Sequence, residues 1–216
     1  MTAVGRLAIG LVVLMQTGCV LYNREITLVD ARGAGAGGWR VCAAGKPTLT
    51  VRVVDGRGRP MPVVGAVRNG FYMPMSEVVT QDDLGLWVTR AISSELRRQG
   101  ECVADLPPAA SPAAAGSRID VSGGITRAWA DAYFTYWGDV ILQVTISDTS
   151  GRSALRIYAG HATGGMNWGS TGESYAHVLN LALADAVSQL VRDLKMKIMV
   201  EFSPAPQPAP AVAGQS

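Results

Sequence analysis

The stretch VILQVTISDTSGRSALRIYAGHA, residues 140–162, decides the fold class. From Val140 to Ile146 every second side chain is apolar, which is the period-2 pattern of a strand with one buried face. The segment DTSGR at 148–152 is typical of a hairpin turn, and residues 154–162 return as the partner strand. We therefore expect a mainly antiparallel sheet built outward from this hairpin.

A first helix is predicted to run from Asp82 or Asp83 to Gln99, with Gly100 as its C-terminal stop. Apolar residues recur along it at helical spacing, so one stripe of the helix faces the core. The members of this stripe are Leu84, Trp87, Val88, Ala91, Ile92 and Leu96.

A second, longer helix is predicted over 173–197, where Ser170 and Glu173 have the spacing of a capping box. Its apolar stripe predicts that it lies on the same sheet. The fold class that follows is α+β, a single domain in which a mainly antiparallel sheet carries two helices packed on one face. The residues of the second stripe are Leu179, Ala182, Leu183, Ala186, Leu190 and Leu194.

Shorter strands are predicted at 49–54 and 118–121. Between the first of these and the first helix, prolines spread over residues 60–74 exclude a regular helix, and Asn69-Gly70 marks a tight turn.

Low-complexity segments flank and interrupt the domain. We interpret residues 19–48 as a lipidated tether with a Gly-rich lead-in, residues 104–117 as a Pro/Ala loop and residues 201–216 as a disordered Pro/Ala tail. The remaining segment, 49–200, is long enough for one core but not comfortably for two. One α/β lipoprotein domain is therefore expected.

Residues 1–18 have the organisation of a signal peptide. Arg6 precedes the apolar run LAIGLVVLM at 7–15, and this run is shorter than the roughly 20 residues that a spanning helix needs. The residues up to Cys19 resemble the end of a bacterial lipobox, although Gln16 stands where an aliphatic residue is usual. We expect cleavage before Cys19 and its acylation by fatty acids such as palmitate. An ordinary secretory signal with an incidental cysteine is the alternative.

The residue after the cysteine predicts the address. Val20 stands where an aspartate would, by the known sorting rule, retain a lipoprotein in the inner membrane. We therefore expect attachment to the outer membrane, facing the periplasm. Because several acyl chains anchor a protein stably whereas one binds only marginally, tethering is expected to be part of the function.

Charge and cysteine content narrow the function classes further. The formal charge of +2 falls to +1 when Arg6 is lost with the signal peptide, so no nucleic-acid partner is expected. Cys42 and Cys102 would enter an oxidising compartment, where a disulfide between them would close a loop of about 60 residues and stabilise the fold by roughly 4 kcal/mol. Two separate buried thiols are the alternative.

Two segments resemble the YajG-type family of periplasmic lipoproteins, whose members are largely uncharacterised. They are VGAVRNGFYM at 64–73 and LWVTRAISSELRRQG at 86–100, within a similar stretch of about 49–196. The resemblance implies a fold and a periplasmic address but no reaction. The order of elements is also similar, more distantly, to auxiliary lipoproteins of envelope transport systems.

No motif indicates a reaction. Gly33, Gly35 and Gly38 spell G-x-G-x-x-G, but no helix can start at these glycines, so a dinucleotide site is not expected. His161 and His177 lack partners at metal-ligand or triad spacing. We expect a non-catalytic protein that binds neither a cofactor nor a metal ion.

The segment RAWADAYFTYWGD holds the most suggestive cluster. Five of the 14 aromatic residues of the chain lie in it: Trp129, Tyr133, Phe134, Tyr136 and Trp137. They could line a ligand groove, enter a membrane interface or anchor a partner. The alternative is a hairpin whose rings cover the helix layer. We expect a membrane-tethered module that binds an envelope partner or an apolar ligand; a purely structural lipoprotein and a periplasmic hydrolase are the alternatives.

Overall fold

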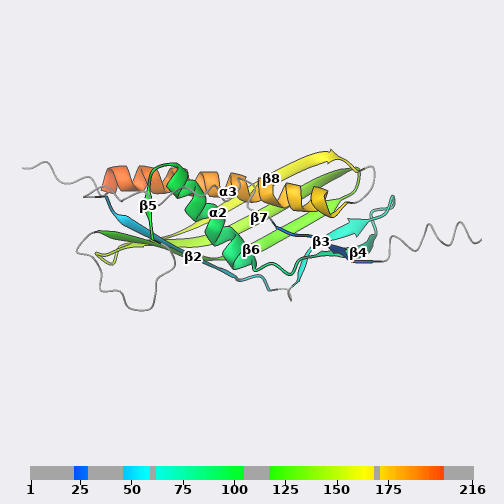
Figure 1. Ribbon diagram of the computed structural model, residues 1–216, viewed down its shortest axis with the longest axis horizontal. Coiled ribbons are helices and arrows are strands. Elements are labelled where there is room, and N and C mark those ends of the chain that lie inside the picture. Colours follow the sequence, from blue (N-terminus) through cyan, green and yellow to red (C-terminus); the bar gives the residue numbers. More distant parts are fainter. Residues whose placement is uncertain (1–21, 29–45, 59–61, 105–116, 168–170, 202–216) are drawn as a thin grey trace, which may run out of the picture.

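The computed structural model describes residues 22–28, 46–58, 62–104, 117–167 and 171–201. They form one α+β domain, an elongated mixed sheet of eight strands with two helices on the same face (Figure 1). The predicted signal peptide, Cys19, Cys42, the glycines at 33–38, most of the Pro/Ala loop and the Pro/Ala tail lie outside the described residues.

Three long strands form the body of the sheet. They are β6 (Arg118–Ala132), β7 (Thr135–Asp148) and β8 (Ser153–Met166), and each is antiparallel to the next. The β7–β8 hairpin confirms the predicted strand pair, and Gly151 in its turn adopts a φ of 82° that favours glycine.

The other edge of β6 is shared by two strands. β2 (Thr48–Asp55) lies along its first half and β3 (Val63–Arg68) along its end, both parallel to it. β5 (Cys102–Val103) pairs with β2, while β4 (Pro74–Val79) pairs with β3 and β1 (Arg24–Glu25) with β4.

The expectation of a mainly antiparallel sheet was wrong. Among the described residues, four of the seven strand pairs are parallel: β1–β4, β2–β5, β2–β6 and β3–β6. The parallel pairs join strands that do not follow one another in the chain. The connection from β2 to β6, for example, contains β3, β4, helix α2 and β5 and is long enough to bring the chain back in the same direction. Hairpin signals reveal only the pairs that neighbour one another in sequence.

Helix α2 (Leu84–Arg98) begins and ends close to its predicted limits. The Asp83 side chain accepts a hydrogen bond from the Leu86 N–H at 3.0 Å, and Gly100 has a φ of 84° just beyond the helix. Five residues of the predicted stripe are buried, with Ala91 partly buried against the same core.

Helix α3 (Gly172–Glu201) crosses β7 and β8 at very close range, and all six residues of its predicted stripe are buried. A Cβ at Gly138 would lie 2.8 Å from the Val178 carbonyl oxygen, and one at Gly160 would overlap the Ala182 carbonyl. Ser170 is outside the described residues, so its capping role stays a prediction. The Trp87 indole donates to the Asn180 side chain at 3.0 Å and joins the two helices.

Side chains of α3 also protect the edge strand β8. Asp185 accepts from the His161 backbone N–H at 3.4 Å, and the Gln189 side chain donates to the Ala159 carbonyl at 2.9 Å. These contacts occupy backbone groups that an edge strand otherwise offers to another chain. No helix within the described ranges is both long and apolar enough to cross a membrane.

Candidate functional site

The aromatic cluster of the sequence is divided among three places. Tyr136 is buried, and its ring packs edge-on against Tyr175 of α3 at a centroid distance of 5.1 Å. Trp129 and Trp137 are half-buried on strands β6 and β7, and Tyr133 and Phe134 form the turn between these strands. The five rings therefore do not form one surface, because successive strand residues point to opposite faces of the sheet.

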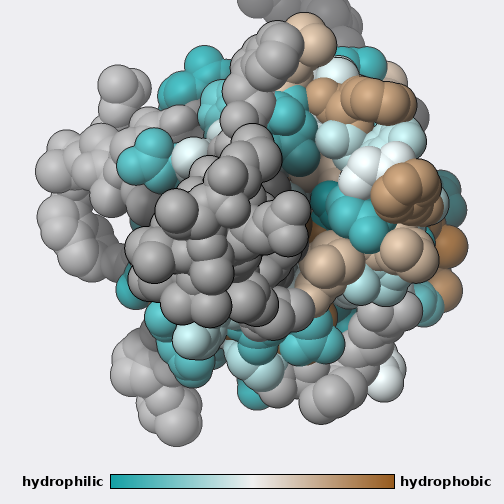
Figure 2. Space-filling view, turned by 90° about the vertical axis from the view of Figure 1, so that its right-hand side faces the viewer, coloured by the Kyte–Doolittle hydropathy of each residue, from teal (hydrophilic) through white to brown (hydrophobic). Residues whose placement is uncertain are grey.

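Exposed apolar side chains gather at the end of the molecule that holds this turn. We call this group the aromatic tip; it comes from the β3–β4 turn, the β6–β7 turn and the end of β8. Of the eleven large apolar side chains that are exposed within the described residues, five belong to the tip. They are Phe71, Tyr72, Met73, Phe134 and Met166. Figure 2 faces this end and shows brown, hydrophobic side chains gathered on one side of it.

Ring contacts join the two turns of the tip. Tyr133 meets Tyr72 edge-on at 5.3 Å and Phe134 at 4.1 Å between ring centroids. The Tyr133 hydroxyl donates to the Gly70 carbonyl at 2.8 Å. Aromatic pairs at such distances stabilise by about 0.5–1.5 kcal/mol beyond their buried area, so the two turns form one unit.

A buried ion pair next to this unit stabilises it. The Asp131 carboxylate, which is fully buried, accepts from Nε of Arg68 at 2.7 Å. The same guanidinium donates to the Tyr72 carbonyl at 3.0 Å and lies 4.2 Å from the centre of the Tyr72 ring. Tyr72 has a φ of 64°, an unusual conformation for a residue with a side chain. Arg68 thus holds the strained residue of the β3–β4 turn against the end of β6.

The sheet face opposite the helices carries a second set of apolar side chains. We call it the outward face. One row of cross-strand partners runs from Val54 through Gly124 and Gln143 to Ile157. Val54, Ile157 and the nearby Leu155 are exposed, and neither helix covers them.

An ion pair lies where strand β2 ends. At the end of β2 the Arg57 guanidinium donates to both carboxylate oxygens of Asp55, each at 2.9 Å. Burial alone would raise the pKa of Asp55, but the bonds and charge of Arg57 hold that pKa below its ordinary value. The carboxylate therefore stays ionised at the end of β2.

The histidines are not assembled into a catalytic group by the described residues. The His161 ring is hydrogen-bonded to Asp139 at 2.7 Å, and Arg127 lies 3.2 Å from the same carboxylate. The group lies on the outward face, and within the described residues neither His161 nor Asp139 is hydrogen-bonded to a Ser, Thr or Cys side chain. His177 is exposed on α3. Within the described ranges no cluster of three or more His, Cys, Asp or Glu side chains is arranged to hold a metal ion.

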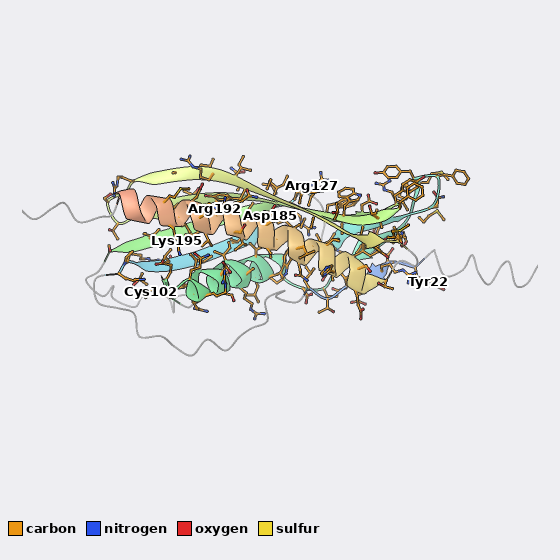
Figure 3. All side chains as sticks on the ribbon, turned by 90° about the horizontal axis from the view of Figure 1, so that it is seen from above. Tyr22, Cys102, Arg127, Asp185, Arg192 and Lys195 are labelled. Atoms are coloured by element: carbon orange, nitrogen blue, oxygen red, sulfur yellow. The ribbon has the colours of Figure 1, made fainter. Side chains whose placement is uncertain are left out.

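Cys102 is disulfide-bonded. Because Cys42 lies outside the described residues, its pairing with Cys102 stays a prediction. Cys102 sits at the far end of the molecule from the aromatic tip, as its label and that of Tyr22 show in Figure 3.

Comparison with known proteins identifies a shared fold. A protein from Xanthomonas campestris assigned to family DUF330 has 12% identity and a TM-score of 0.50, over 84% of this chain and 97% of that one. An uncharacterised protein has 10% identity and a TM-score of 0.45, over 80% and 99%. No family model and no curated protein matches the sequence. The likeness to the Xanthomonas campestris protein is one of fold.

Four of the five tip residues were missed from the sequence. The residues NGFYMP at 69–74 contain three exposed apolar side chains, Phe71, Tyr72 and Met73. The signal was present, since a turn at Asn69-Gly70 followed at once by Phe-Tyr-Met places large apolar groups where polar ones are usual. The sequence could not show that this turn lies beside Phe134.

Proposed function

We propose that the protein is a lipid-anchored lipoprotein of the bacterial envelope, attached to the periplasmic face of the outer membrane. Its domain is a non-catalytic module that binds an envelope protein or an apolar ligand in envelope assembly or transport. The anchor is supported by LVVLMQTGC at 11–19, where an apolar run ends at Met15 and the small residues Thr17 and Gly18 precede Cys19.

The observation that carries the binding role is the exposure of Val54, Leu155 and Ile157 on the outward face. Ile157 is 69% exposed, and Val54 and Leu155 are each more than half exposed. Burying such side chains against a partner stabilises a complex by about 25 cal/mol per Å² of apolar surface. Exposed apolar surface that no partner covers lowers the solubility of a protein.

The anchor is tested by intact mass and membrane fractionation of the full chain beside Cys19→Ala. We expect a mass increment of lipid size and outer-membrane retention, both lost in the variant. An unmodified wild type in the soluble fraction would remove the lipoprotein part of the proposal.

The binding role is tested in living cells with a photo-crosslinking amino acid at Ile157. The matched control is the same group at Arg156, an exposed neighbour that points to the other side of strand β8. A protein-sized adduct at 157 alone indicates a protein partner, and a small apolar adduct indicates a ligand. No adduct at 157 favours a purely structural lipoprotein.

A further inference from the structure

We propose that the aromatic tip enters the interface of the bilayer that holds the lipid anchor, so that the domain stands end-on to the membrane. This inference rests on the proposed anchor at Cys19 and adds an orientation to it. It assigns the five tip side chains to lipid and leaves the outward face open to a partner.

The path of the chain places the tip beside the anchor. Strand β1 runs parallel to β4, and Asn23 accepts a hydrogen bond from the Glu77 N–H at 3.2 Å. Going back along the chain from Arg24 therefore leads toward the start of β4, which follows directly on the tip residue Met73. Figure 3 places the label of Tyr22 at this end of the molecule. Cys19 precedes Tyr22 by three residues, which extend over about 10 Å at most.

The tip has the chemistry of a membrane interface. The segments 69–74, 133–135 and 164–167 contain no Asp, Glu, Lys, Arg or His. The nearest cation, Arg68, is engaged by Asp131 and by the Tyr72 carbonyl. Tyr and Trp are enriched at the level of lipid headgroups because their rings are amphipathic, and Phe is common on the apolar face of segments that lie in this interface. Tyr72 is half exposed at the tip, and Phe71, at 85% exposed, and Phe134, at 69%, extend purely apolar rings into solvent.

The polar backbone of the β3–β4 turn is already bonded within the protein. The Asn69 side chain accepts from the N–H groups of Phe71 and Met73 at 2.9 and 3.0 Å. The Tyr72 N–H donates to the Asn69 carbonyl at 3.0 Å. Each backbone group that enters lipid without a partner costs several kcal/mol, and these groups avoid that cost.

The β6–β7 turn is satisfied in the same way. The Phe134 carbonyl accepts from the Asn167 N–H at 2.8 Å, and the Tyr133 carbonyl from the Asn167 side chain at 3.3 Å. Both turns thus direct apolar side chains outward and hydrogen-bonding groups inward. A surface that recognises a protein through hydrogen bonds would offer the opposite arrangement.

The anchor and the tip have different effects. The acyl chains hold the protein on the membrane, but attachment at one point does not by itself fix the orientation of the domain. A second contact at the tip selects one orientation. Loss of the tip contact should therefore change orientation without changing membrane retention.

The experiment uses the full lipidated chain in vesicles of phosphatidylethanolamine and phosphatidylglycerol. A nitroxide is placed at Phe134→Cys and, in a second protein, at Ile157→Cys; both native side chains are 69% exposed, so neither substitution disturbs the core. Collisions with oxygen, which concentrates in lipid, and with a water-soluble nickel chelate are compared. We expect the 134 probe to lose access to nickel and gain access to oxygen on reconstitution, with no change at 157.

The outcomes separate the two proposals. A lipid-sized mass together with a 134 probe that stays as open to nickel as the 157 probe overturns the end-on orientation and leaves the lipoprotein proposal intact. A chain without the lipid mass overturns both. Crosslinking of position 134 to a protein in cells, in place of lipid, overturns the assignment of the tip to the bilayer.

Discussion

At the scale of single residues, one ion pair between distant parts of the sequence organises the tip. Arg68 and Asp131 are 63 residues apart, and their contact joins the β3–β4 turn to the end of β6. A buried carboxylate without its partner is an uncompensated charge, and removing one member of such a pair costs about 3–5 kcal/mol. The pair is therefore expected to set the stability of this end of the sheet.

Arg68→Met should lower the free energy of unfolding by about 3 kcal/mol, at the low end of that range because Arg68 is partly exposed. Urea denaturation measures the change. The control is Arg118→Met, since the Arg118–Asp120 pair is nearly half exposed on both sides and contributes less than about 1 kcal/mol. Equal losses in the two variants would contradict the special role of Asp131.

A second residue, Asp148, makes the stability depend on pH. Its carboxylate accepts from the Ser150 hydroxyl at 2.7 Å and from Arg152, and these bonds lower the pKa of Asp148 from 3.8 to about 2. Because the folded pKa is the lower one, the ionised group stabilises the fold above about pH 4, and this contribution is lost as the pH falls toward 2. Asp148→Asn should be less stable than wild type at pH 7 and match it near pH 2, in thermal melts across that range. A difference that persists unchanged at pH 2 would argue against this origin.

These two residues differ in what the sequence could reveal. The role of Asp148 follows from the local pattern DTSGR, because all its partners lie within four residues. In the sequence, Asp131 stands out only as a member of the aromatic segment at 127–139. Its partner is distant in sequence, and only the parallel pairing of β3 with β6 brings them together.

At the scale of elements, helix α3 depends on the absence of side chains beneath it. The backbone of the helix lies so close to β8 that a methyl group at Gly160 would overlap the Ala182 carbonyl, whereas nothing lies within 4 Å of a methyl at Gly165. Both glycines belong to the same strand. They form a matched pair for testing the helix–sheet distance.

Gly160→Ala should displace α3 and destabilise the domain by about 1–3 kcal/mol, the usual cost of overpacking a core. Gly165→Ala should be neutral or slightly stabilising because alanine restricts the unfolded chain. Urea denaturation of the two variants gives the comparison. Similar stability of both would mean that the helix can shift at no cost.

The elements also show where periodicity was sufficient. Both helices bury the predicted stripes, because each packs one face against the core and the apolar residues of that face recur at helical spacing. Strand β6 was predicted only over 118–121, since a register shift between Ile125 and Arg127 moves its buried face from odd to even positions. Strand β3 escaped notice because four consecutive residues, 64–67, are buried and no alternation appears.

At the scale of the whole molecule, the two ends of the domain differ in the groups that they carry. The aromatic tip and the start of β1 share one end, and the disulfide-bonded Cys102 and the β7–β8 turn lie at the other. The five rings that the sequence places in one cluster do not form one surface, because neighbouring strand residues point to opposite faces of the sheet. Phe134 was the member that the structure places in the tip, and its companions Phe71 to Met73 come from a turn 61 to 63 residues earlier.

An end-on domain places the β7–β8 turn far from the lipid. Strand β7 contains 14 residues and leads from the tip to this turn, a distance of about 45 Å at 3.3 Å per residue. A donor dye on Thr149→Cys and acceptor dyes on lipid headgroups should report roughly this separation in the full lipidated chain. Adding Phe71→Asp and Phe134→Asp removes the apolar contact, so the separation should become shorter and broadly distributed while the lipid mass is retained. An unchanged distribution in that variant would mean that the tether alone, and not the aromatic tip, sets the orientation of the domain.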